Sequence, residues 1–304
     1  LLTILRILLQ WKLDYDILAP RSRRAILFVH IHKAGGTTIC AIAKSANLSV
    51  PRDPLHDVGF FGRNCNPSSR DAGDALGYRG PDAMVRYAHE HQLDLYGHEW
   101  ALPAFFSFAD IDVIALVRHP LRLYRALCYV VPNTTGALGI KAQHCLLSPW
   151  VINYQVRRYA GCDGSFAICA GKMGRQDSLF AHGHAMARPL VGYRGNAVTN
   201  VTEAHFRQAV SFLNRAAVVL VTEQLDMSSH ILSRKFGWPS VPTTRAGSHS
   251  NASDLSLEEL EARMPQATLT TLRAAAQFDF QLHVHATCLF ALLLAHHGNQ
   301  TQRC

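Results

Sequence analysis

Short, continuous runs of apolar residues alternate along the chain with segments in which apolar residues recur at helical spacing. Runs of about four to eight residues rich in β-branched and aromatic side chains predict buried strands. Four such runs are present, at 25–31 (AILFVHI), 93–97 (LDLYG), 111–117 (IDVIALV) and 216–223 (AAVVLVTE). Helical spacing predicts helices over 37–46, 81–92, 121–131, 149–160, 226–238 and 256–264. In a long final helix, one face carries Phe278, Leu282, His285, Leu289 and Leu292.

Local signals mark where several of these helices begin and end. Pro81 and Pro120 suit a first helical turn, and Gly237 suits a helix end. Ser256 and Glu259 have the spacing of a capping box. Strands that alternate with helices and are apolar throughout predict an α/β fold with a mostly parallel sheet covered on both faces. Loops are expected over 52–80, 132–149 and 161–197, the last of which is rich in glycine.

The composition is that of a folded chain. Hydrophobic residues make up 48% and charged residues 17% of 304 residues, which excludes wholesale disorder. We expect one domain over 25–297, preceded by a stem or anchor remnant over 1–24 and followed by a tail over 298–304. The apolar start is interrupted by Arg6 and is shorter than the roughly 20 residues of a membrane span. Since the chain does not begin with Met, we expect a longer protein with an N-terminal membrane anchor.

The net charge of +8 and a pI near 9.2 favour an anionic partner. The basic residues are scattered rather than gathered in a tail, which argues against nucleic acid. An anionic polysaccharide, a nucleotide and a membrane surface remain as partners.

Cysteines and glycosylation sequons indicate a secretory compartment. The eight cysteines form no Cys-x-x-Cys pair and allow 105 full pairings. Cys162 and Cys169 flank a short loop that a disulfide can close, whereas Cys40, inside an expected buried helix, is predicted to be a free core thiol. Unmodified sequons remain the alternative at each of the five sites, Asn47, Asn133, Asn200, Asn251 and Asn299.

The segment HIHKAGGTT at 30–38 carries the strongest chemical signal. Gly35 and Gly36 permit a tight turn at the start of a helix, where backbone amides and the helix dipole favour an anion. Thr37 and Thr38 add hydroxyl donors and Lys33 adds a positive charge, so we expect a site for a phosphate-like group. The segment matches neither a Walker A loop nor a GxGxxG loop. An ordinary strand–helix turn that needs two glycines is the alternative.

The same segment resembles the 5′-phosphosulfate loop of carbohydrate sulfotransferases, and ALVRHPLRLYRAL (115–127) resembles their 3′-phosphate segment. The likeness continues through NYQVRRYAG (153–161), VLVTEQLDMSSHILSRKFGW (219–238) and the final helix. The nearest group is that of the Golgi heparan sulfate and uronyl O-sulfotransferases. The resemblance implies a P-loop-like central parallel sheet flanked by helices in one sulfotransferase-like catalytic domain.

The resemblance also implies a donor, 3′-phosphoadenosine 5′-phosphosulfate (PAPS), and a glycan acceptor. By carry-over, Arg118 pairs with the 3′-phosphate, where a guanidinium can give two hydrogen bonds. The family places serines four and eight residues after this arginine, and this chain has Arg122 and Ala126 there. Arg122 can replace a hydroxyl with a charge, or the departure weakens the donor site. The 5′-phosphosulfate would be held by Lys33, Gly35, Gly36, Thr37 and Thr38.

Sulfuryl transfer needs a base for the acceptor hydroxyl and a cation at the leaving phosphate. His98 follows an expected strand and resembles the family's catalytic histidine, and Lys33 suits the cation. Glu99 is the fallback base. No metal site is expected, because no histidine pair has a recognised ligand spacing with a third ligand.

Further polar residues lie in or beside the segments that carry the resemblance. His32 and His119 flank the two cofactor segments. Gln155 and Arg157 lie in the segment that resembles the family's acceptor side, although an exposed helix face explains them as well.

The predicted function is therefore O-sulfation of a glycan hydroxyl by a single-pass type II protein in the Golgi lumen. A catalytically inactive relative that binds anionic glycans is the first alternative, because of Ala126. A P-loop nucleotide kinase is the second, although no acidic metal ligands stand out after a strand.

Overall fold

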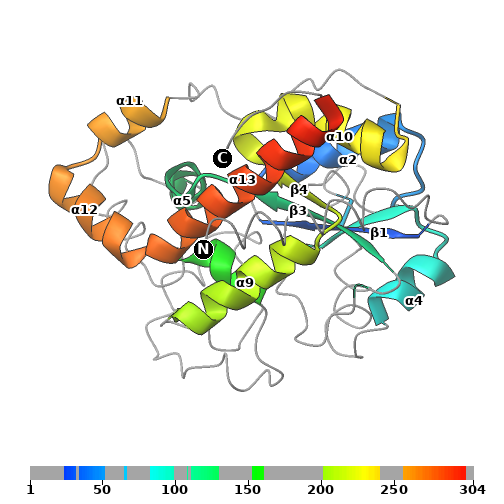
Figure 1. The fold of residues 1–304 in the computed structure, drawn as a ribbon, viewed down its shortest axis with the longest axis horizontal. Coiled ribbons are helices and arrows are strands. Elements are labelled where there is room, and N and C mark those ends of the chain that lie inside the picture. Colours follow the sequence, from blue (N-terminus) through cyan, green and yellow to red (C-terminus); the bar gives the residue numbers. More distant parts are fainter. Residues whose placement is uncertain are drawn as a thin grey trace.

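A computed structural model describes residues 24–31, 34–51, 65–66, 83–98, 108, 111–129, 153–160, 201–239 and 256–298. Its four strands are β1 (Ile26–His30), β2 (Leu95–His98), β3 (Asp112–Val117) and β4 (Val218–Val221). They form one parallel sheet in the order β2-β1-β3-β4. Almost every strand residue is buried, as continuous apolar strands in a parallel sheet require. The α/β class and the parallel sheet flanked by helices are thus confirmed (Figure 1).

Helices connect and cover these strands. They are α2 (Gly36–Ser45), α4 (Ala83–Glu90), α5 (Pro120–Tyr129), α7 (Tyr154–Ala160), α9 (Glu203–Arg215), the short 3₁₀ turn η3 (Thr222–Gln224), α10 (Leu225–Phe236), α11 (Leu257–Ala262), α12 (Gln266–Ala275) and α13 (Gln277–Gly298). α13 packs on β4 and also on α9 and α7, while α2 packs on β2. In Figure 1, α13 runs diagonally past β4, and α9 lies below it.

Several local predictions are confirmed. α5 begins at Pro120, and Gly237 ends α10 in the left-handed conformation with φ 70°. The Ser256 hydroxyl accepts the amide of Glu259, whose carboxylate accepts the amide of Ser256 in return. On α13, Leu282 and Leu289 of the expected apolar face are buried.

Two helices and one boundary differ from expectation. α9 and α12 were not predicted from the spacing of apolar residues. The helix expected over 149–160 begins only at Tyr154, because Asn153 takes a left-handed conformation with φ 53°, which asparagine tolerates.

The prediction of a free Cys40 is wrong, since Cys40 is bonded to Cys65. This disulfide joins α2 to the segment whose Cys65 carbonyl accepts the Gly97 amide of β2. Cysteine count and spacing cannot select this pair, because it depends on how α2 and β2 pack. The expected Cys162–Cys169 pair lies outside the described residues.

By length and composition alone, one helix of the described part, α13, is apolar enough to cross a membrane over Gln277–His296. A buried core helix passes the same test, and α13 places Leu282, Ala286 and Phe290 in the core. Residues 1–23 and 299–304 lie outside the description, so the expected stem and tail remain predictions.

Candidate functional site

The two segments expected to bind the cofactor meet at one place on the sheet. β1 and β3 are neighbours, and the chain passes from β1 to β2 on one side and from β3 to β4 on the other. The carboxyl ends of such a strand pair form the topological switch point, where α/β sheets bind ligands. Ala34 and Gly35 follow β1 there, and Arg118 and His119 follow β3.

The glycine turn after β1 opens α2. Gly35 has φ 99°, a left-handed conformation that favours glycine, and a Cβ at Gly36 would lie 2.5 Å from the His30 ring. Both glycines therefore have packing reasons to be present, whatever the turn binds. Gly35 offers no side-chain cap, and the first turn of α2 carries no acidic residue. The positive end of the α2 dipole thus faces the switch point, and no carboxylate in the first turn of α2 neutralises it.

Thr222 ties the glycine turn to the end of β3. Its hydroxyl lies 2.6 Å from the Ala34 carbonyl oxygen and 3.2 Å from that of Val117. A threonine just after β4 thus links the segment that follows β1 to the end of β3. This role of Thr222 was not identified from the sequence, although a polar residue directly after a buried strand is an available signal.

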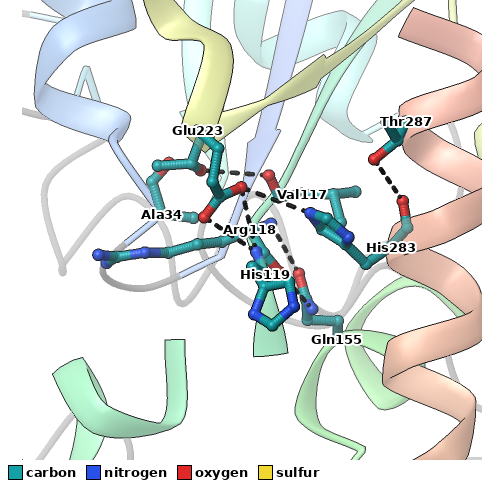
Figure 2. Close-up of polar contacts among 9 residues, drawn as sticks. Ala34, Val117, Arg118, His119, Gln155, Glu223, His283 and Thr287 are labelled. Atoms are coloured by element: carbon teal, nitrogen blue, oxygen red, sulfur yellow. Dashed lines mark hydrogen bonds and ion pairs between the residues drawn. The ribbon is translucent and has the colours of Figure 1, made fainter. Parts of the chain in front are cut away.

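The main chain of Arg118 is held from α7. The Gln155 side chain accepts the Arg118 amide at 3.0 Å and donates to the Arg118 carbonyl at 2.8 Å. Figure 2 shows the Arg118 side chain running past Ala34, away from His283. Gln155 is fully buried, so an exposed helix face does not explain it, and both ends of its amide are engaged with Arg118. Its direction is set by α7, which no sequence pattern specifies.

Arg122 lies on α5, one turn after Arg118, and is half-buried. Its charge is one of the groups that lower the pKa of His119. Ala126 follows one turn later and is half-buried as well. The two departures from the family pattern therefore share one side of α5.

Glu223 forms a second polar group beside Arg118. Its carboxylate oxygens accept the His119 amide at 3.1 and 3.2 Å, and one of them lies 3.4 Å from Nε2 of His283 on α13. The His119 and His283 rings are 5.0 Å apart. Glu223 and His283 were not identified from the sequence, and for His283 no sequence signal exists because α13 reaches β4 only through the tertiary fold.

The pKa values in this group move in defined directions. Burial, the nearby His283 and the charge of Arg122 lower the pKa of His119 to about 4, against the opposing effect of Glu223. Burial raises the pKa of Glu223, but the contacts with His283 and with the His119 amide outweigh it, so this pKa lies below its usual value. At neutral pH, His119 is therefore neutral and Glu223 is ionised.

His98 is the last residue of β2, opposite Val29 of β1, and is 1% exposed. It lies at the same carboxyl edge as the glycine turn, on the side of β1 away from Arg118. Among the predicted site residues that the structure describes, Gly35, Gly36, Thr37 and Thr38 lie at the start of α2, whereas Arg118 follows β3 and Arg122 lies on α5. Outside the described residues lie His32, Lys33, Glu99 and the Arg157 side chain.

Among the sequons, Asn47 is exposed just after α2, while Asn133, Asn200, Asn251 and Asn299 lie outside the described residues. Within the described part, no group of three His, Cys, Asp or Glu side chains is placed to hold a metal ion. Comparison of the sequence with protein-family models and with curated proteins finds no match.

Proposed function

We propose that this chain is a carbohydrate O-sulfotransferase that moves a sulfuryl group from PAPS to a glycan hydroxyl. The observation that carries the proposal is the meeting of two cationic elements at the switch point. The uncapped start of α2 follows β1, Arg118 follows β3, and Thr222 links the two segments. The spatial pairing agrees with the sequence resemblance, which assigns these same two segments to the two ends of one donor molecule.

The donor set fits a ligand with phosphate groups at both ends. Helix amides and the Thr37 and Thr38 hydroxyls suit the 5′-phosphosulfate, while Arg118 and Arg122 suit the 3′-phosphate. When bound, PAPS supplies an activated sulfuryl group. Lys33 neutralises the charge that grows on the leaving phosphate, and His98 takes the proton of the acceptor hydroxyl.

Two observations support a compartment in the secretory pathway. The Cys40–Cys65 disulfide belongs to oxidising compartments, and the Asn47 sequon is exposed. A Golgi-lumen type II protein acting on an anionic polysaccharide, consistent with the net charge of +8, is the proposed setting.

A catalytically inactive glycan-binding relative is the second candidate. It is favoured by the 1% exposure of His98 and by the lack of a hydroxyl at Ala126. Such a protein would bind anionic glycans without the donor, and its binding would weaken with salt.

Thermal unfolding with 3′,5′-adenosine bisphosphate, with AMP as the control ligand, separates these candidates. At about 100 times its Kd, a ligand stabilises a protein by about 2.7 kcal/mol, which raises Tm by several degrees. We expect this rise with the bisphosphate only, and a smaller rise in Arg118→Ala, which retains weaker binding. The matched control is Arg207→Ala, since Arg207 is an exposed arginine of α9. No rise in folded wild-type protein, or an equal rise with AMP, contradicts the donor site.

Transfer itself is tested with labelled PAPS and a panel of glycans. Lys33→Ala should abolish transfer without unfolding the protein, and His98→Ala should lower turnover while donor binding persists. An active Lys33→Ala variant refutes the assignment of the glycine turn.

A further inference from the structure

We propose that Gln155 is a positioning residue that sets the direction of Arg118 for a terminal phosphate monoester, and that Asp279 in turn sets Gln155 through the first turn of α7. The inference rests on the proposed function, because it assigns to Arg118 the 3′-phosphate of the donor. It is carried by hydrogen bonds that run from α13 through α7 to the end of β3.

The Arg118 peptide lies just beyond the sheet ladder. The last register pairs of β3 are Leu116 with His30 of β1 and Val117 with Val221 of β4. The Gln155 amide supplies both an acceptor and a donor to Arg118, as a further strand would. These two bonds hold the peptide groups on both sides of the Arg118 Cα.

One face of α7 is hydrogen-bonded to the end of β3. Gln155 and Tyr159 are four residues apart and therefore share a helix face. The buried Tyr159 hydroxyl donates to the Leu116 carbonyl at 2.6 Å, two residues before Arg118. α7 thus contacts this strand end at two points, of which only the Gln155 contact reaches Arg118.

Asp279, near the start of α13, holds the start of α7. Its carboxylate is 0% exposed and accepts the amides of Gln155 at 3.2 Å and Val156 at 2.9 Å. The Asn153 side chain adds bonds to the Ala275 carbonyl and the Asp279 amide. These hydrogen bonds fix the first turn of α7 against α13. In this orientation of α7, the Gln155 side chain points towards the end of β3.

A purely structural role explains this glutamine poorly. A buried primary amide costs free energy unless its polar atoms are hydrogen-bonded, and an apolar residue would fill the same space without that requirement. Here both bonds go to one residue, and Arg118 is the residue at the switch point. Holding its main chain before the ligand arrives lowers the ordering cost of binding.

Calorimetric titration of the full chain with 3′,5′-adenosine bisphosphate and with AMP tests the inference. Gln155→Met keeps the shape and removes both bonds to Arg118. We expect the bisphosphate Kd to rise about tenfold, which corresponds to about 1.4 kcal/mol, while AMP affinity changes less than about twofold. The matched control is Tyr159→Phe, which removes the other contact of α7 with β3. It should lower Tm but change the bisphosphate Kd less than about twofold.

A double-mutant cycle distinguishes a positioning role of Gln155 from a purely structural one. In an Arg118→Ala background, Gln155→Met should leave the bisphosphate Kd unchanged, because the residue through which it acts is gone. If Gln155→Met does not fold, Gln155→Asn takes its place, since its shorter neutral amide cannot make both bonds to Arg118. We expect about a threefold rise in Kd for this variant.

The outcomes separate the two proposals. If the wild type prefers the bisphosphate over AMP but folded Gln155 variants bind it equally well, the positioning role is overturned and the proposed function stands. An equal loss in Tyr159→Phe also overturns the positioning role. If the wild type shows no preference for the bisphosphate, the proposed function fails and this inference falls with it.

Discussion

Replacing Asp279 with alanine should be among the most destabilising single changes in the described part of the chain. The Asp279 carboxylate is fully buried and accepts the Tyr124 hydroxyl at 2.6 Å and the amides of Gln155 and Val156. Each buried donor left without an acceptor costs about 1–3 kcal/mol. The tyrosine hydroxyl can turn and water can enter the vacated space, so the loss of an acceptor for three donors should cost about 3–5 kcal/mol in total.

The assay is urea and thermal unfolding of Asp279→Ala beside a matched Asp226→Ala variant. Asp226 also lies in the first turn of a helix but is exposed, so its loss should cost less than about 1 kcal/mol. For a chain of this size, the Asp279→Ala loss should lower Tm by about 6–10 °C. Tyr124→Phe should couple to Asp279→Ala by about 1 kcal/mol or more in a double-mutant cycle, because they share a hydrogen bond.

Two results would refute this reasoning. If Asp279→Ala costs no more than Asp226→Ala, the carboxylate does not stabilise the start of α7. If the Tyr124 and Asp279 effects simply add, the 2.6 Å hydrogen bond is not an energetic link between α5 and α13.

Three further predictions concern the site and the fold. The pKa of His119 is about 4 in the folded chain and 6.5 in the unfolded chain, so the unfolded state binds more protons between these pH values. The free energy of unfolding should therefore fall as the pH drops from 6.5 towards 4. In unfolding measured at several pH values, His119→Gln should flatten this dependence. Gly36→Ala should destabilise by about 1–3 kcal/mol, because its Cβ meets the His30 ring at 2.5 Å, and His30→Ala should relieve most of that loss in the double variant. Reduction of the Cys40–Cys65 disulfide should cost about 3.5 kcal/mol for a loop of 25 residues, and Cys65→Ser should show the same loss without reductant in the same unfolding assay.

Much of the sheet could be read from the chain because its signals are local. The run at 111–117 is apolar without interruption, and β3 occupies Asp112–Val117. The omission of α9 was avoidable, since Ala209, Phe212 and Leu213 are buried at helical spacing. By contrast, the late start of α7 rests on the left-handed conformation of Asn153 and on a carboxylate from α13, which no local pattern reveals.

The candidate site divides in the same way. The glycine turn and Arg118 were identifiable because each directly follows an apolar strand, and parallel strands bring their carboxyl ends to one edge. The inward direction of Gln155 and its contact with Arg118 were not identifiable. The pairing of Cys40 with Cys65 was equally out of reach, because spacing alone does not tell which thiols meet.

Apolar runs, caps and breakers lie within a few residues of one another, so the primary structure was enough for the strands, for most helix ends and for the two segments that line the switch point. The partners of its polar groups are far apart in the chain. Thr222 and Ala34 are separated by 188 residues, and Asp279 and Gln155 by 124. Such pairs form only once strand order and helix packing are established, because a hydrogen bond needs two groups within about 3 Å of each other. The spacing of apolar residues along the sequence does not tell which distant residues come that close. The folded molecule therefore assigns Thr222, Glu223 and Asp279 their contacts, and with them the direction in which Arg118 is held.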